Sequence, residues 1–173
     1  MSELLFNELP RPTFRWLRVN HTVSSLAGED TAVQSIAVEA NKDILSPLPV
    51  GTALLDGNYE GANKEAVHVL VEKAEGYAIN VPPKAKEVVG IRIDANARVA
   101  NRFQFIVGEG AELEVQFYVT GSGDALTNVS YLNEYDVKEA GKVVVKKVNL
   151  LPEHVQHIEH RYTKFCLLYT SPS

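Results

Sequence analysis

Residues 102–121 read RFQFIVGEGAELEVQFYVTG, and this stretch decides the class of fold. Apolar side chains alternate with polar ones on both sides of a Gly-Glu-Gly turn at residues 108–110. The alternating apolar positions are Phe103, Phe105 and Val107 before the turn, and Leu113, Val115, Phe117 and Val119 after it. Such alternation indicates strands with one buried face. The stretch therefore predicts two strands joined by a short turn.

The same period of two recurs on both sides of this stretch. It predicts further strands at residues 67–71, 77–81, 89–93, 129–131 and 143–150, which are rich in Val, Ile and Tyr. Turn signals separate these strands, and Gly121-Ser122-Gly123-Asp124 is the one that resembles a hairpin turn. We expect no helix after residue 65. Without strand–helix alternation, a doubly wound nucleotide-binding fold is excluded.

The pattern predicts an all-β protein, built as a sandwich, a barrel or a β-helix. A long series of strands with short corners suits stacked coils, although periodicity alone does not separate a β-helix from a β-sandwich. We expect three segments: an irregular or mixed N-terminal segment at 1–64, a β core at 65–165 and a tail at 166–173. Short helices and short strands fit residues 26–64 equally well. Phe14 and Trp16 are expected to pack onto the main body.

The composition is that of an ordinary globular protein. The 173 residues include 17 Lys plus Arg and 22 Asp plus Glu, for a formal net charge of −5. This mild acidity argues against a nucleic-acid partner, which normally meets a basic stripe. No apolar run reaches the roughly 18 residues of a membrane helix. The N-terminus lacks the basic end and apolar stretch of a signal peptide, so we expect a cytoplasmic protein with no membrane partner.

Three histidines are the strongest candidate for a metal site. His154, His157 and His160 form an HxxHxxH pattern, and imidazoles bind zinc, copper or iron well. On a helix they would lie loosely on one side, whereas in a strand His157 points away from the other two. We favour solvent-facing or coil-stacking histidines, with a metal or partner site as the alternative.

No catalytic constellation is visible, so we predict that the protein is not an enzyme. The chain has no GxSxG elbow and no GxxxxGK[ST] loop, and we assign no catalytic, cofactor-binding or metal residues. Glu112, Glu114 and Glu134 are expected on solvated strand faces. A small basic patch is expected at the polar edge of the last strands, made of Lys138, Lys142, Lys146 and Lys147.

The tail has an unusual sequence. Residues 166–173 read CLLYTSPS, which matches one translated frame of a widely used transposon sequencing adapter. We therefore expect the natural sequence to be readable only to about Phe165, and the chain to be the N-terminal part of a longer protein. Cys166 is the single Cys, so a disulfide framework and a Cys-clustered metal site within this chain are excluded. As part of the tail, it carries no functional weight.

Two stretches resemble the SufB/SufD family. Residues 7–20, NELPRPTFRWLRVN, are similar to the N-x-L-P-x-x-T-[WF]-x-W-L-x-V-N opening of short SufD-like proteins. The second stretch runs from Arg102 to Tyr162. Within it, RFQFIVGEGAELEVQFYVTG, NEYDVKEAGKVVVKKVNLL and HVQHIEHRY resemble successive coils of the family's core.

The resemblance implies both a fold and a function. The fold is a right-handed parallel β-helix flanked by helical parts. The function is that of a non-catalytic scaffold subunit of the SUF system, which builds iron–sulfur clusters in the cytoplasm. The implied partners are a SufC-type ATPase and a SufB/SufD paralogue.

The functional residues of the family lie elsewhere in its members. Cluster assembly and SufC docking belong to the C-terminal end of the family, so we carry over no functional residue and expect no cofactor in this chain. The complete complex would carry an iron–sulfur cluster transiently.

Two other functions stay open. One is a β-solenoid or sandwich ligand-binding module, for instance for carbohydrate, which would need an exposed row of aromatic residues. The predicted inward parity of Phe103, Phe105, Phe117 and Tyr131 disfavours it. The other is a His-dependent, metal-binding protein of the cupin kind.

Overall fold

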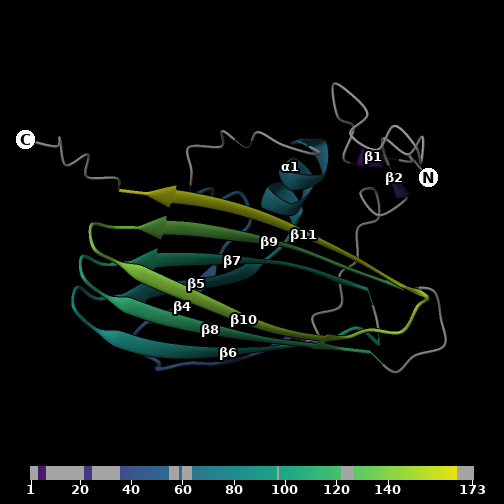
Figure 1. Cartoon of the computed structure of the whole chain (residues 1–173). Helices are drawn as coiled ribbons and strands as arrows, with labels where there is room; N and C mark the ends of the chain where they lie inside the picture. Colours follow the sequence, from purple (N-terminus) through teal and green to yellow (C-terminus); the bar gives the residue numbers. More distant parts are fainter. Residues whose placement is uncertain are drawn as a thin grey trace, which may run out of the picture.

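A computed structural model describes residues 4–6, 22–24, 36–54, 59, 64–96, 98–121 and 127–166. Most of these residues lie in strands, and two sheets of the structure face each other (Figure 1). The mainly β class predicted by the alternation is therefore confirmed. The segment with Phe14 and Trp16, the 7–20 motif and residues 167–173 lie outside the described residues.

The described residues contain one helix, α1 (Lys64–Lys73). Four short strands precede it: β1 (Leu4–Phe6), β2 (Thr22–Ser24), β3 (Ile36–Glu39) and β4 (Leu45–Leu48). Seven longer strands follow: β5 (Gly76–Val81), β6 (Lys86–Asp94), β7 (Val99–Val107), β8 (Glu112–Thr120), β9 (Thr127–Val137), β10 (Lys142–Leu150) and β11 (Val155–Phe165). β1 and β2 form a separate antiparallel pair.

From β5 onward, the chain passes from one sheet to the other after every strand. One sheet has the order β10-β8-β6-β3, and the other has the order β11-β9-β7-β5-β4. Each strand from β5 to β9 pairs in parallel with the strand two further along. β3 and β4 join antiparallel, each at the edge of its sheet. The strands of residues 26–64 thus extend both sheets.

The hairpin predicted at Gly121–Asp124 is wrong. The strands on either side, β8 and β9, lie in different sheets and do not pair with each other. Residues 122–126 themselves lie outside the described residues. The chain crosses from one sheet to the other between β8 and β9, so this segment does not join two adjacent antiparallel strands.

The turns at the other end of the strands repeat one geometry. They occupy residues 82–85, 108–111 and 138–141, and the third residue of each has a left-handed φ: Lys84 (62°), Gly110 (62°) and Ala140 (53°). The first two turns each donate a main-chain hydrogen bond to the turn that follows. The Lys84 amide is 2.9 Å from the Glu109 carbonyl, and the Gly110 amide is 2.9 Å from the Glu139 carbonyl. The turns are therefore stacked in register with the strands.

The core between the sheets consists of the inward-facing residues that alternation predicted. Phe103, Phe105, Phe117 and Tyr131 are all buried. The ring of Phe103 meets Phe117 and Tyr131 edge to face, with centroids 5.7 and 6.2 Å apart. Such pairs stabilise a core beyond the apolar area they remove from water. The predicted inward parity of these four rings is confirmed.

The helix α1 corrects two predictions. Residues 67–71 do not form a strand, and a helix does follow residue 65. Val67, Leu70 and Val71 lie on one helical face and are buried against Leu132, on the outer side of β9. Their spacing is also compatible with an amphipathic helix. Leu132 offers the helix an apolar contact on this side of the sheet, and this tertiary contact outweighs the strand propensity of valine.

Candidate functional site

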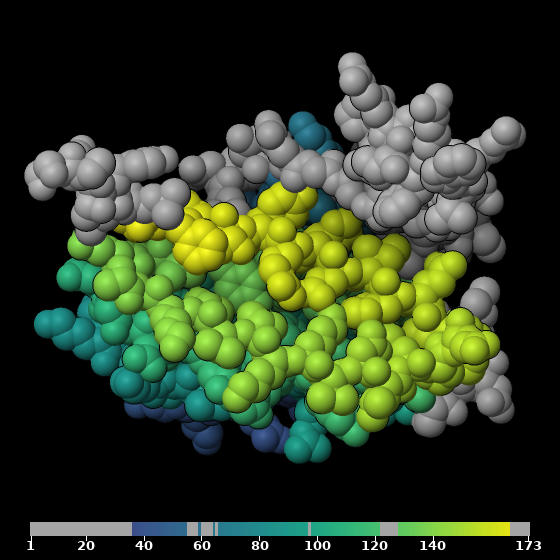
Figure 2. Space-filling view, in the orientation of Figure 1, coloured from purple at the N-terminus to yellow at the C-terminus, as the bar shows by residue number. Residues whose placement is uncertain are grey.

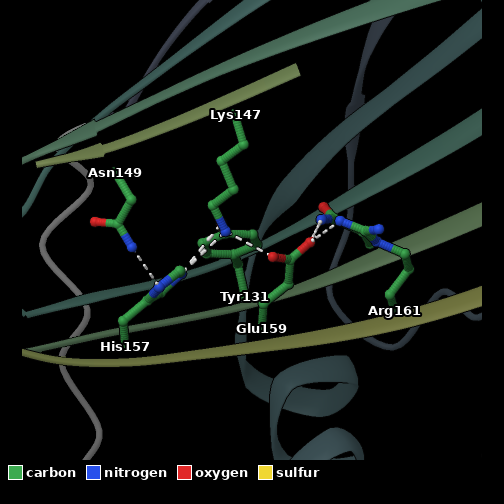
Figure 3. Close-up of polar contacts among 7 residues, drawn as sticks. Tyr131, Lys147, Asn149, His157, Glu159 and Arg161 are labelled. Atoms are coloured by element: carbon green, nitrogen blue, oxygen red, sulfur yellow. Dashed lines mark hydrogen bonds and ion pairs between the residues drawn. The ribbon is translucent and has the colours of Figure 1, made fainter. Parts of the chain in front are cut away.

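A group of charged side chains lies between the sheets, at the strand that ends each sheet. Inward positions on β7 and β9 are mostly apolar, but on β11 they carry His157, Glu159 and Arg161. Lys147 points toward them from β10 (Figure 3). We call this group the end cluster. It comprises Tyr131, Asn133, Lys147, Asn149, His157, Glu159 and Arg161.

Glu159 lies at the centre of the end cluster and accepts three hydrogen bonds. Lys147 Nζ donates to one carboxylate oxygen at 2.6 Å, while Arg161 and Asn133 donate to the other at 2.8 Å each. Burial alone would raise the pKa of Glu159, but the bonds from Lys147 and Arg161 outweigh it and hold that pKa below its usual range. Glu159 is therefore ionised at neutral pH and fixes both cations.

Lys147 does not belong to the basic patch predicted for the strand edge. Strand parity places it inward with Val143 and Val145, and its side chain is 21% exposed. Its ammonium lies 5.0 Å from the centroid of the Tyr131 ring, a cation–π contact. The prediction grouped it with Lys146, the next residue, which points to the opposite face and pairs with Glu114 at 2.8 Å.

His157 is held as a neutral imidazole. Its Nδ1 lies 3.1 Å from the Asn149 amide nitrogen, and its Nε2 lies 3.2 Å from the Tyr131 hydroxyl. Burial and the ammonium of Lys147, 3.4 Å away, lower the pKa of His157 to about 4. A second proton on the His157 ring would place a positive charge beside the ammonium of Lys147, at a position partly shielded from water.

The three predicted histidines do not converge. His154 precedes β11, His157 points between the sheets, and His160 is buried on the opposite face, aligned with Leu132. The separation of His157 from His160 is the one that strand parity predicts. Within the described ranges, no group of three or more His, Cys, Asp and Glu residues is arranged to hold a metal ion.

A second buried polar group lies on the outer side of β7 and β9, and sequence reasoning missed it. Arg102 is fully buried and donates to three main-chain carbonyls: Pro49 at 2.7 Å, Thr52 at 2.6 Å and Ala74 at 3.0 Å. Burial lowers the pKa of Arg102, although the nearby carboxylate of Glu134 opposes this. Arg102 thereby fastens the residues before and after α1 to the sheet.

Glu134 is also fully buried, so the solvated face predicted for it is wrong. It accepts hydrogen bonds from the hydroxyl of Tyr59, from Gln104 at 3.0 Å and from the Leu54 amide at 3.1 Å. The parity was correct, but α1, residues 49–54 and Tyr59 cover this face. Glu112, by contrast, is exposed and pairs with Lys86 at 3.0 Å.

The outer face of the β10-β8-β6-β3 sheet carries a groove with a volume of about 540 Å³. Gly90 lies in its lining between Arg92, Tyr118 and Lys146. Several exposed apolar side chains share this face, among them Val148 at 47% and Leu150 at 58% exposure. Val148 and Leu150 therefore do not continue the buried series of Val143 and Val145, because they have the opposite parity.

Comparisons with protein-family models, curated proteins and solved structures each gave no match. No described helix is both long and apolar enough to cross a lipid bilayer. The end cluster is the candidate functional site, on the geometry and charge of its own residues.

Proposed function

We propose that this chain belongs to a non-catalytic scaffold subunit of the SUF iron–sulfur cluster assembly complex, of the SufB/SufD type. The observation that carries the proposal is the parallel pairing of each strand with the strand two further along, with the chain alternating between sheets. A parallel β-helix with two strands in each coil has this connectivity, and the resemblance of residues 102–162 implies a parallel β-helix. The finer fold that we propose is a right-handed parallel β-helix.

The buried polar groups of the described residues support a structural role. Arg102 and Glu134 bind main-chain atoms and fasten one part of the chain to another. Stacked strands give a rigid surface, which suits a protein on which partners assemble. In this proposal, a SufC-type ATPase supplies ATP hydrolysis, a SufB/SufD paralogue is the second partner, and the complex works in the cytoplasm. The iron–sulfur cluster is cargo of the complete complex.

Neither alternative function has a specific observation in its favour. Four of the aromatic rings that a carbohydrate module would need on its surface are buried in the core. A cupin-like metal site would need converging histidines, but His157 and His160 point to opposite faces of β11.

The proposal is tested with the gene from which this sequence comes. The DNA is read with long reads across the codon of Phe165, and the encoded protein is expressed together with neighbouring gene products. We expect an adjacent gene for an ABC-type ATPase, and co-purification of the protein with that ATPase and a SufB/SufD paralogue. A folded protein that captures neither partner would contradict the proposal.

A second measurement tests the absence of cofactor residues in this chain. The 173-residue chain is incubated with iron and sulfide under anaerobic conditions, and the bound metal is quantified after gel filtration. We expect no stable cluster on the purified chain, and no stimulation when the chain is added to a SufC-type ATPase in a separate assay. Stoichiometric iron and sulfide on the purified chain would show that the chain holds ligands for a cluster.

A further inference from the structure

Most of the exposed large apolar side chains lie on the outer face of the β10-β8-β6-β3 sheet. Among the described residues seven such side chains are exposed, and five of them belong to this face: Val88, Tyr118, Val144, Val148 and Leu150. β10, β8 and β6 run along the lower side of the molecule in Figure 1, and their teal to green residues reach its surface in Figure 2. Apolar side chains gathered on one exposed face mark an interaction surface.

The exposure of this face extends to the middle of the sheet. β8 lies between β10 and β6, and β6 lies between β8 and β3, so both strands have neighbours on either side. Val88 on β6 and Tyr118 on β8 are nevertheless exposed. The outer face of the other sheet is covered by α1, residues 49–54 and Tyr59. Parallel sheets are usually covered on both faces, so a partner on this face would complete the pattern.

The charges of this face balance one another. Strand parity turns four cations and four carboxylates of the described residues outward: Lys86, Arg92, Lys142, Lys146, Glu39, Asp94, Glu112 and Glu114. Three ion pairs join six of them within the chain. A face without net charge attracts neither a nucleic acid nor a strongly charged peptide. It can, however, meet a copy of itself without net repulsion.

A hollow in this face lies next to a projection. Gly90 has no side chain, and the groove of about 540 Å³ lies over it, bordered by Glu39 and Gln116. Two residues further along the same strands, Arg92 and Tyr118 are paired neighbours and project from the face. The projection and the hollow are therefore about 6.6 Å apart along the strands. A two-fold axis across the strands, midway between them, places the projection of each copy over the hollow of the other.

We propose that this face is the interface of a symmetric dimer of the chain, with its two-fold axis across β6 and β8 between Gly90 and Arg92. Arg92 of each copy enters the hollow over Gly90 of the other copy and meets the carboxylate of Glu39 there. Tyr118 of each copy packs over Gln116 of the other. The contact is isologous, so each interaction is made twice. This inference does not depend on the proposed function.

The same axis covers exposed apolar side chains of β10. The register places the axis level with Lys147, and Val144 and Leu150 each lie three residues from it. Val144 of one copy therefore faces Leu150 of the other, and both leave water. The contact is centred on a few strands, and small interfaces are weak. We thus expect a chain that is monomeric in dilute solution and dimeric at high concentration.

The test is sedimentation velocity of the 173-residue chain over a range of concentrations. The variants are Glu39→Arg and Arg92→Glu, each of which opposes like charges at both symmetric contacts. An equimolar mixture of the two variants opposes unlike charges again, because one chain then carries two arginines and the other two glutamates. The matched controls are Asp43→Arg and Lys42→Glu, which make the same changes of charge at exposed residues of the turn between β3 and β4.

We expect the parent chain to dimerise, and each charge variant alone to raise the dissociation constant by about tenfold or more. The mixture should recover the dimer, and the controls should associate as the parent does. A parent chain that stays monomeric at every concentration, or a mixture that does not recover, would overturn the proposal. Controls that weaken association as much as the variants do would assign it to net charge and overturn the interface.

A variant that fills the hollow gives a second measurement. A Cβ at Gly90 would lie 3.5 Å from Glu39 Cβ, an ordinary contact, so Gly90→Val should fold and yet exclude Arg92 of the second copy. Circular dichroism checks the fold, and the dimer should weaken as in the charge variants. If either charge variant fails to fold, Gly90→Val decides. Association that Gly90→Val leaves unchanged belongs to another surface, such as a strand edge, and contradicts this interface.

Discussion

At the scale of single residues, substitutions should differ widely in how much they lower the free energy of unfolding. Arg102 is the residue for which we expect the largest loss. Arg102→Met would remove the three hydrogen bonds that Arg102 donates to main-chain carbonyls and would leave Glu134 without its nearby cation. We expect the free energy of unfolding to fall by about 3 kcal/mol, as for other broken buried polar networks. Urea denaturation followed by circular dichroism measures the change.

The control for Arg102 is Arg92, which lies on β6 in the other sheet. Arg92 lies on an exposed face and pairs with Glu39 at 3.4 Å. Exposed ion pairs contribute little, so Arg92→Met should change stability by less than about 1 kcal/mol. Equal losses in the two variants would contradict a stabilising role for the buried hydrogen bonds of Arg102.

The lowered pKa of His157 predicts how the free energy of unfolding depends on pH. Its pKa is about 4 in the folded chain, mainly because of burial, against an ordinary value near 6.5 in the unfolded chain. Between these values the unfolded state binds more protons, so stability falls as the pH is lowered from about 6.5 to about 4. Thermal unfolding across this window should show a smaller loss in His157→Gln. An unchanged profile in that variant would assign the acid sensitivity to other groups.

At the scale of elements, the stacked turns predict that one substitution stabilises the chain and that a neighbouring one destabilises it. Ala140 has a left-handed φ of 53°, a conformation that glycine adopts without strain, so we expect Ala140→Gly to raise stability by about 0.5–1 kcal/mol. Gly141 does not have that conformation, but a Cβ there would lie 2.9 Å from the Lys138 carbonyl oxygen. Gly141→Ala should therefore destabilise the chain. Chemical denaturation of both variants tests the pair.

Local pattern predicted the strands well but not everything that covers them. Parity alone placed Phe103 and Tyr131 inward, because in a strand each residue faces opposite to its neighbour. The same parity placed Glu134 outward, which is correct, and nothing in the local sequence shows that α1 covers that face. Residues 67–71 have apolar spacings that fit a strand and a helix alike. Only the tertiary contact with Leu132 distinguishes them.

The candidate site was less predictable than the fold. The three histidines attracted attention through their spacing, yet only His157 belongs to the end cluster. Lys147 was placed with the exposed lysines, because a run of two lysines does not tell which one points inward. The cluster joins residues from β9, β10 and β11, and their meeting depends on which strands pair. Periodicity predicts strands, but it does not predict their pairing.

At the scale of the whole molecule, we expect the edge strands β10 and β11 to favour association. β10 and β11 each have one neighbour in the described sheets, so one edge of each is open to another chain. Lys142 and Lys146 lie on the outer face of β10, and lysines on edge strands oppose such pairing. We expect Lys142→Thr combined with Lys146→Thr to increase self-association, measured by sedimentation velocity over a range of concentrations.

A charge-matched control separates this edge effect from solubility. Lys42→Thr with Lys73→Thr removes the same charge from residues that lie on neither terminal strand. That variant should sediment as the parent chain does. If both double variants associate equally, net charge and not the strand edge governs the association.

The stacked turns have a mechanical consequence. The amide of Gly108 is 2.9 Å from the Val81 carbonyl, Lys138 repeats this bond to Val107, and Cys166 repeats it to Val137 at 3.1 Å. Each layer is thus held by the one before it, and neighbouring layers supply most of its contacts. Under tension applied at the C-terminus, the molecule should peel in discrete steps of one layer, beginning with β11. The layers nearest α1, which Arg102 fastens, should yield last.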